Sequence, residues 1–398
     1  MKMFAQNGYG EAQKVNQGME KDFIDGVIYS PKDINPNKLL EKLNEQSDSF
    51  KKKELLFDPQ FYVSMMSSNP LLNIGKLEEY SDTYFSFESK GRLERESNVK
   101  SIIQKTIEFQ SSVPVTSIIS PNILISRSFD SIEGAISKNF IRNAKEINNQ
   151  FNSKKRVYAT LAISAEALMN TNELQEFLSA ITIYDSPPPD GFYLLISARS
   201  LAIAHAEIFN ADVIAGWMLL NYTLALNGFS VINGYSDLLS PLLVAVGAEG
   251  ISTGWNSNLR NFSLERFAPE KREGGSQPII RYLSSSLLNR IRFDELAALK
   301  TSFDQVTNNL STDLLFDNAD IDRTIEILQN WQTLNVISKE FTKGTVDQNL
   351  DLFFGKILKA TELYAKISTF YPLDKKSLGY HLEPIRFAID KFKRIAEI

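Results

Sequence analysis

The sequence predicts an α/β fold, a (β/α)8 TIM-like barrel followed by a C-terminal α-helical extension. Short β-branched runs alternate with segments of helical periodicity from residue 23 to about residue 265, which is typical of a mostly parallel sheet. That stretch is close to the roughly 250 residues of a typical barrel of this kind. From residue 280 onward, apolar residues recur only at helical spacing. An open doubly wound sheet is the alternative arrangement of the same elements.

The barrel is expected to span residues 23–272, after a polar, glycine-containing N-terminal arm at residues 1–22. Seven strands are expected, near residues 26, 55, 115, 158, 193, 230 and 251. The run at residues 157–163 is almost continuously apolar, as in strands that are buried on both faces of a parallel sheet. The eighth strand is placed near residue 84 or near residue 213, where shorter β-like runs occur.

Two other segments stand apart from the alternating pattern. Residues 64–96 are irregular and interrupted by proline and glycine, and an insertion of this length is more often a lid or a partner surface than a plain connection. Residues 280–398 form the helical extension, in which Leu350, Phe353 and Ile357 share one helix face. We expect a protein partner, or a second copy of the chain, to bind through this extension.

The composition excludes several classes of site. The 398 residues are 43% hydrophobic and 23% charged, which is ordinary for a globular protein. A net charge of −5 gives no overall attraction for a phosphate backbone, and only a local basic groove leaves nucleic-acid binding open. Without cysteine, the chain has no disulfide, thiolate nucleophile or Cys-ligated metal. Its two histidines, His205 and His381, are expected to pack in the core, which disfavours a histidine triad.

The hydropathy pattern predicts a cytoplasmic protein with no membrane partner. The longest apolar run, around residues 214–226, is interrupted by Asn221 and Tyr222 and is too short to span a bilayer. The N-terminus lacks an apolar stretch of signal-peptide length. No cofactor can be named from the sequence.

Residues 228–256 contain two short strands that both end near glycine. The residues that matter are Asn233-Gly234, Gly247-Ala248-Glu249-Gly250 and Thr253-Gly254. This unit resembles the phosphate-binding closing unit of many (β/α)8 enzymes. The resemblance implies that the backbone N–H groups at Gly234 and Gly254 approach an anion. The bulky Tyr235 and Trp255 depart from that pattern, and tight turns are the alternative role of the glycines.

Polar residues follow the expected strands, and the carboxyl ends of the strands carry the active site in a parallel barrel. We therefore expect a site for a small anionic ligand at these ends. The candidate ligand-binding residues are Lys32, Gln60, Asn122, Arg199, Asn233, Gly234, Tyr235, Thr253, Gly254, Trp255, Asn256 and Arg260. Since polar residues must end strands somewhere, each residue carries little weight alone.

The candidate catalytic residues are Asp58, Glu166 and Asp33, because carboxylates at different strand ends converge in a barrel. Together with Asp237 they could instead bind a divalent ion through oxygen, but we assign no metal site, since capping of the next helix is the commoner use of such residues. Pro59 disfavours a helical backbone at Asp58 and would hold that carboxylate in place as a general base. A turn-forming aspartate is the alternative.

The position of Asp58 at a strand end resembles that of an aspartate in the tRNA-guanine transglycosylases, which are also barrels. The chain departs from that family in two ways. It has no cysteine for the family's zinc ion, and Ser252-Thr253-Gly254 stands where the family's nucleophilic aspartate is expected.

Two functions follow from these observations. The first is an enzyme that acts on a small anionic or nucleotide-like ligand by carboxylate acid/base chemistry. The second is a catalytically inactive barrel that serves as a binding or scaffold subunit of a larger assembly, with or without nucleic acid. Convergence of Asp58, Glu166, Arg199 and Asn233 on one open pocket would favour the enzyme. Their mutual pairing in a closed barrel top would favour the scaffold.

Overall fold

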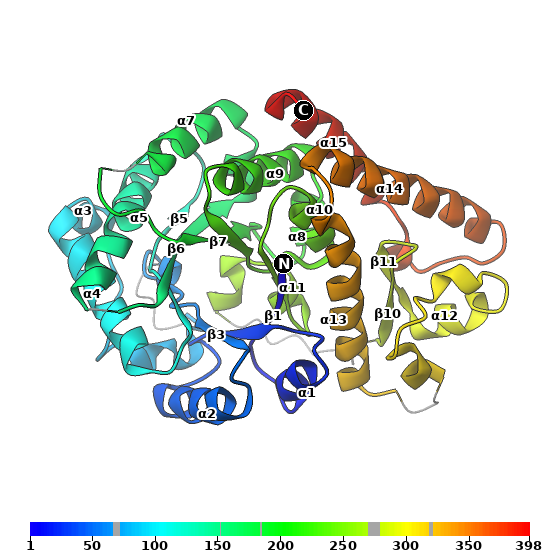
Figure 1. Ribbon diagram of the computed structural model, residues 1–398, viewed down its shortest axis with the longest axis horizontal. Helices are drawn as coiled ribbons and strands as arrows, with labels where there is room; N and C mark the ends of the chain where they lie inside the picture. The colour runs from blue at the N-terminus through cyan, green and yellow to red at the C-terminus, as the bar shows by residue number, and fades with distance from the viewer. Residues whose placement is uncertain (67–71, 152, 184, 270–278, 318–320) are drawn as a thin grey trace.

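The computed structural model describes residues 1–66, 72–151, 153–183, 185–269, 279–317 and 321–398. Within these residues the chain forms a nearly closed barrel of parallel strands with helices around it. Further helices follow in the C-terminal part of the chain (Figure 1). The barrel strands are β1 (Lys2–Gln6), β2 (Gly26–Tyr29), β3 (Glu54–Phe57), β4 (Ser117–Ile119), β6 (Arg156–Ser164), β7 (Gly191–Ser197), β8 (Ser230–Asn233) and β9 (Gly250–Thr253). The predicted TIM-like fold with a helical extension is confirmed.

The strands follow one another around the barrel in the order β3-β2-β1-β9-β8-β7-β6-β4. The two ends of this path meet at Thr116, just before β4, whose backbone N–H donates to the Leu55 carbonyl of β3 at 2.8 Å. The Thr116 hydroxyl accepts from the Leu55 N–H at 3.1 Å. These contacts bring the two ends of the path together and leave the barrel nearly closed, so the open doubly wound alternative is wrong. A further short strand, β5 (Leu124–Ile125), pairs with the end of β6.

The first barrel strand lies in the segment that was expected to be an N-terminal arm. β1 pairs with β2 on one side and with β9 on the other, and its residues Met3, Phe4 and Ala5 are fully buried. In the described part of the chain, residue 84 lies in a turn and residue 213 lies in helix α9 (Ala211–Leu226). Both placements of the eighth strand are therefore wrong. Three apolar residues beside a polar stretch give only a weak sequence signal for a strand. They are buried because β2 and β9 pack on either side of them.

Helices surround the barrel as the alternating pattern predicts. The helices of the ring are α1 (Lys14–Glu20), α2 (Pro36–Ser49), α4 (Glu96–Ser112), α5 (Ile132–Gln150), α7 (Thr171–Thr182), α9, α10 (Ser240–Ala245) and α13 (Arg323–Lys339). The sequence placed α13 in the extension, but it packs against α10 and α1, and its Trp331 donates to the Thr253 carbonyl of β9 at 3.3 Å. α13 is thus the eighth helix of the barrel, and residues 254–322 are inserted before it.

Side chains at the first turn explain where several of these helices begin. Asn35, Ser131, Asn170, Asn210 and Asp322 each accept a hydrogen bond from a backbone N–H of the helix that follows. Short helices occupy the connections. They are α3 (Lys90–Leu93), α6 (Ala165–Leu168), α8 (Ala204–Ile208), α11 (Ser257–Arg260), η1 (Phe61–Val63), η2 (Gly75–Tyr80), η3 (Asp237–Leu239), η4 (Leu264–Phe267), η5 (Asp304–Val306), η6 (Asp313–Asp317), η7 (Glu340–Thr342) and η8 (Lys375–Ser377).

A β-hairpin stands beyond residue 280, where the sequence predicted helices alone. Strands β10 (Arg281–Ser284) and β11 (Asn289–Arg292) pair antiparallel, and α12 (Phe293–Leu299) follows them. The four-residue strands are rich in arginine and polar residues, so they lack a strand signal. Their position depends on α13, because the Gln329 side chain bonds both the N–H and the carbonyl of Leu283, at 3.0 and 2.8 Å.

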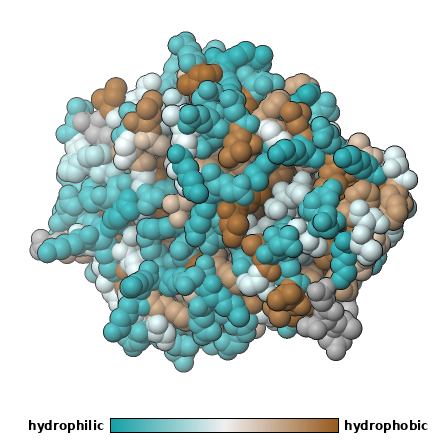
Figure 2. Space-filling model, turned by 45° about the vertical axis from the view of Figure 1, so that its right-hand side comes forward, coloured by the Kyte–Doolittle hydropathy of each residue, from teal (hydrophilic) through white to brown (hydrophobic). Residues whose placement is uncertain are grey.

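The helical extension consists of α14 (Val346–Ser368) and α15 (Leu382–Ala396). α15 packs against α9 of the barrel as well as against α14 (Figure 1). The face shown in Figure 2 is mostly hydrophilic, with separate apolar patches. Among the described helices, none has the length and apolar character needed to cross a membrane.

The insertion at residues 64–96 is anchored to the barrel, although residues 67–71 lie outside the described part. Residues 84–87, a candidate strand, form none. Tyr80 and Tyr84 instead pack their rings against Phe57 at the end of β3. A role of this insertion as a lid or partner surface stays a prediction.

Candidate functional site

Asp58 directly follows β3, and its side chain is fully buried at the barrel mouth, the end of the barrel where the strands finish. Its Oδ1 accepts from the Gln60 N–H and its Oδ2 from the Tyr62 hydroxyl, both at 2.9 Å. Gln60 has a left-handed φ of 52°, which is uncommon for a residue with a side chain. The turn after Pro59 thereby directs this N–H back to Asp58. The residues Asp58 to Tyr62 hold the carboxylate in one orientation.

Burial raises the pKa of Asp58 to about 6, because a carboxylate loses hydration when it leaves water. Hydrogen bonds from Gln60 and Tyr62 and the positive charge of Arg266 lower the pKa, but they do not offset the burial. The carboxyl therefore changes its protonation state within about one pH unit of neutrality. A general acid or base needs this property.

Arg266 is a buried cation at the same mouth. Its Nη1 donates to the Tyr235 hydroxyl and its Nη2 to the Asp33 carboxylate, both at 2.9 Å. Because Asp33 follows β2 and Tyr235 follows β8, Arg266 joins loops from two parts of the barrel. Tyr193 of β7 lies beside Asp58, and its hydroxyl donates to Gln6 Oε1 at 3.4 Å. Carboxylates, phenols and a guanidinium thus share one buried polar cluster.

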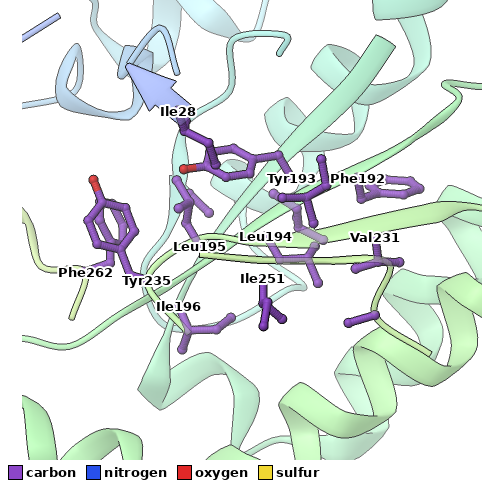
Figure 3. Packing of buried hydrophobic residues seen from close by; sticks show 14 of the residues in the cluster. Ile28, Phe192, Tyr193, Leu194, Leu195, Ile196, Val231, Tyr235, Ile251 and Phe262 are labelled. Atoms are coloured by element: carbon purple, nitrogen blue, oxygen red, sulfur yellow. The ribbon is translucent and has the colours of Figure 1, made fainter. Parts of the chain in front are cut away.

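Residues 261–268, which we name the closing segment, cover this cluster. The Phe262 carbonyl accepts from the Ala198 N–H at 2.9 Å, which extends β7 by one bridge. The Phe262 ring contacts Tyr62, with centroids 4.9 Å apart, and Tyr235, with centroids 5.4 Å apart. Figure 3 shows the Phe262 and Tyr235 rings against each other. The closing segment shields Asp58 from solvent.

Some of the predicted residues come together here. Asp58, Asp33, Gln60 and Tyr235 belong to the buried cluster, and Gln60 Oε1 accepts from the Lys32 N–H at 3.1 Å. Lys32 contributes this backbone group, while its ammonium bonds a backbone carbonyl of the insertion. The prediction that polar residues after the strands come together therefore holds for five residues at this mouth, namely Lys32, Asp33, Asp58, Gln60 and Tyr235.

Three predicted residues lie elsewhere, and two of them, Asn233 and Asn122, bond the framework of the barrel. Asn233 accepts from the Trp217 indole N–H at 2.7 Å, so it faces helix α9 rather than the barrel interior. Asn122 donates to the Thr160 carbonyl at 2.7 Å. The Arg199 side chain is 73% exposed, which places it outside the buried cluster. Asp58, Glu166, Arg199 and Asn233 therefore neither converge on one open pocket nor pair with one another.

The predicted residues after β9 hold the loop in place. The Trp255 indole donates to the Tyr9 carbonyl at 2.7 Å, and Arg260 forms an ion pair with Glu326 of α13 at 3.5 Å. Asn256 stands at the start of α11. These contacts fasten the loop to the β1 loop and to α13, so they join the barrel to its last helix.

The glycines of the 228–256 unit are surrounded by protein atoms. A Cβ at Gly254 would lie 2.4 Å from Leu259 Cβ, and a Cβ at Gly234 would lie 2.8 Å from the Tyr193 hydroxyl. Both glycines are therefore required by close packing. Gly247 has a φ of +108°, which favours glycine and makes a tight turn. Phosphate binding at this unit stays a prediction.

The predicted carboxylates do not form one ligand set for a metal. Asp237 accepts from the Thr253 hydroxyl at 2.7 Å and pairs with Arg290 of β11 at 2.7 Å. Asp33 instead pairs with an arginine at the mouth, and Glu166 is exposed on α6. Among the residues that the structure describes, no group of three or more His, Asp or Glu could hold a metal ion.

Sequence reasoning missed four residues of the cluster, namely Gln6, Tyr193, Phe262 and Arg266. Gln6 was missed together with its strand. In the sequence, Tyr193 resembles one more apolar strand residue, although the polarity of its hydroxyl is a usable signal. Phe262 and Arg266 come from a loop without periodicity, so no pattern placed them over the barrel mouth.

No protein-family model matches the chain, and no curated protein matches it. Its function is therefore inferred from the geometry of the barrel mouth.

Proposed function

We propose that the protein is an enzyme that acts on a small anionic or nucleotide-like ligand at the barrel mouth, with Asp58 transferring a proton. The observation that supports this proposal best is the fully buried Asp58 carboxyl, whose pKa is raised to about 6 by burial. It stands at the carboxyl ends of parallel strands, where this fold places its active sites. A group with a pKa near neutrality can both accept and return a proton.

The anionic part of the proposal is supported by Arg266. This side chain is 7% exposed and is oriented by Tyr235 and Asp33. A buried, oriented guanidinium suits a carboxylate or a phosphate group, because its donors match the planar arrangement of the acceptor oxygens. Tyr62 and Tyr193 add two phenols beside Asp58.

The second candidate is a scaffold subunit, and exposed apolar residues of the extension favour it. Leu352 and Leu358 of α14 are 46% and 45% exposed, and Phe387 of α15 is 49% exposed. Contiguous apolar patches mark protein contact surfaces, and these side chains would contribute to such a patch on the extension. The closing segment, which covers Asp58, also fits a barrel without turnover. The two candidates differ on one measurable point, because the scaffold subunit has no turnover at the barrel mouth.

The test is turnover by the wild type and by the Asp58→Asn variant. Each protein is incubated in deuterated water with nucleotides, sugar phosphates and organic acids, and nuclear magnetic resonance follows product formation and loss of carbon-bound protons. We expect one ligand class to react. The rate of that reaction should be at least about 100-fold lower in Asp58→Asn than in the wild type. Glu166→Gln, which alters an exposed carboxylate, is the matched control. Unchanged turnover in Asp58→Asn would remove Asp58 from the mechanism.

A thermal-shift screen with the same ligands tests binding independently of turnover. A ligand that binds only the folded protein raises its melting temperature. If no nucleotide, sugar phosphate or organic acid shifts the melting temperature, the proposed anionic ligand is wrong.

A further inference from the structure

We propose that the ligand of the barrel mouth presents acceptor oxygens of an oxyanion, a carboxylate or a phosphate, to three side-chain donors, Gln6, Gln60 and Arg266. The proposal rests on the proposed function for its location beside Asp58. It goes further because it assigns the ligand's chemistry and the residues that select it.

The oxygen of the Gln6 amide faces two hydroxyl groups. Gln6 ends β1, and its side chain is fully buried. Its Oε1 accepts from the Ser252 hydroxyl at 3.0 Å, and Ser252 Oγ in turn accepts from the Tyr235 N–H at 3.0 Å. Gln6 Oε1 also accepts from the Tyr193 hydroxyl at 3.4 Å, so two hydroxyl groups donate to the amide oxygen. Gln6 Nε2 is then a buried donor without a partner among the described residues.

The Gln60 amide is oriented in the same way. Its Oε1 accepts from the backbone N–H of Lys32 at 3.1 Å, and a backbone N–H can only donate. The amide nitrogen must therefore point elsewhere, and Gln60 Nε2 has no partner within the described residues. The side chain is fully buried, and the N–H of the same residue holds Asp58. This donor thus lies in the loop that carries the proposed proton-transfer group.

Arg266 supplies the third donor. Two of its nitrogens bond Tyr235 and Asp33, whereas its Nε is buried and has no partner in the described part of the chain. Leaving a buried donor unpaired is costly, so three such donors in one hydrogen-bonded cluster point to acceptor atoms that the ligand supplies. The Ser30 hydroxyl, also buried and unpaired, can donate or accept and does not restrict the ligand.

The chemistry of this set selects the class of ligand. Two primary amides and a guanidinium offer only N–H groups, so a ligand that itself presents donors leaves them unpaired. Because Asp33 already pairs with Arg266, the N–H donors rather than the net charge of the cluster select the ligand. Carboxylate and phosphate oxygens each accept several hydrogen bonds. An oxyanion therefore fits the three donors better than an amine, a polyol or a neutral aromatic ring.

The experiment measures anion binding with defined probes. Malonate and inorganic phosphate are titrated into the full-length protein by calorimetry and thermal shift, with ethanolamine as the cationic control. We expect one of the two oxyanions to bind and ethanolamine to leave the melting temperature unchanged. The better of malonate and phosphate identifies the source of the oxygens as carboxylate or phosphate.

Variants locate the binding. Gln60→Met removes the donor at similar side-chain length and is expected to weaken binding about tenfold or more. Gln175→Met, on an exposed site of α7, is the matched control. Phosphate salts stabilise folded proteins in general, and this effect acts equally on Gln60→Met and Gln175→Met. Gln6→Met is the second variant if Gln60→Met fails to fold. Wild-type affinity in a folded Gln60→Met or Gln6→Met protein overturns the proposal, as does failure of both oxyanions to bind the wild type.

The Asp58→Asn variant separates this proposal from the proposed function. It leaves the three donors intact and is expected to bind the same oxyanion as the wild type. Binding without turnover in both the wild type and Asp58→Asn would support the donor set and reject the enzyme. Turnover of a ligand that lacks acceptor oxygens would support the enzyme and reject the donor set.

Discussion

Replacement of Asp58 by asparagine is expected to stabilise the folded protein at neutral pH while it removes the proposed catalytic group. Burial raises the pKa of Asp58 from 3.8 to about 6, so an ionised carboxyl at this position costs folding free energy. The shift of about 2 pH units corresponds to about 3 kcal/mol. The side chain is 0% exposed, so water does not screen this cost. Asparagine never ionises, and it retains an acceptor for the Gln60 N–H.

The stability gain depends on pH in one direction. Above about pH 6 the wild-type carboxyl is ionised in the folded protein, and Asp58→Asn has its full advantage. Between about pH 6 and about pH 4 the folded wild type binds a proton that the unfolded chain does not yet bind, so the advantage shrinks. Below about pH 4 it is lost.

Urea unfolding of both proteins from about pH 4 to about pH 8 measures this dependence. Glu166→Gln, which alters an exposed carboxylate, is expected to behave as the wild type throughout. A less stable Asp58→Asn at pH 8, or a difference that stays constant on acidification, would refute the reasoning.

Three further predictions concern the framework of the site. Burial lowers the pKa of His381 to about 4. As the pH falls below about 6.5, the unfolded chain therefore binds a proton at His381 before the folded protein does, and the free energy of unfolding is expected to decrease. Unfolding midpoints should show a smaller fall for His381→Gln, and an equal fall would contradict this reasoning. Asp33→Asn breaks the ion pair with Arg266 and is expected to speed hydrogen exchange in the closing segment, as measured by mass spectrometry. Unchanged exchange would show that this ion pair does not hold the segment. Gly254→Ala places a Cβ 2.4 Å from Leu259 Cβ and is expected to lower the free energy of unfolding by about 1–3 kcal/mol. A neutral effect in urea unfolding would mean that the loop adapts.

The strands that the sequence predicted best are those whose signal is local. The apolar run at 157–163 corresponds to β6 (Arg156–Ser164), and eight of its nine residues are buried. A strand buried on both faces needs apolar residues at every position, so it stands out from its flanks. β1 and the β10–β11 hairpin are short and end in polar residues, and neighbouring elements determine their conformation.

The site was predictable to the extent that it is built from one loop. Asp58, Pro59 and Tyr62 lie within five residues of one another, and Pro59 makes a rigid loop readable from the sequence. Gln6 and Arg266 reach the same place from the first strand and from the loop after β9. Nothing in the periodicity of either segment shows which atoms they will meet.

By itself, the sequence determined the alternation of strands and helices, because hydrophobic spacing within a segment reports its secondary structure and the faces it buries. Only the tertiary structure decided which polar strand-end residues meet. Closing the ring turns Asp58 and Gln60 inward while Asn233 faces α9 and Arg199 faces solvent. That choice depends on the orientation of each strand end and on a distant loop that covers the mouth, and neither is encoded in local spacing.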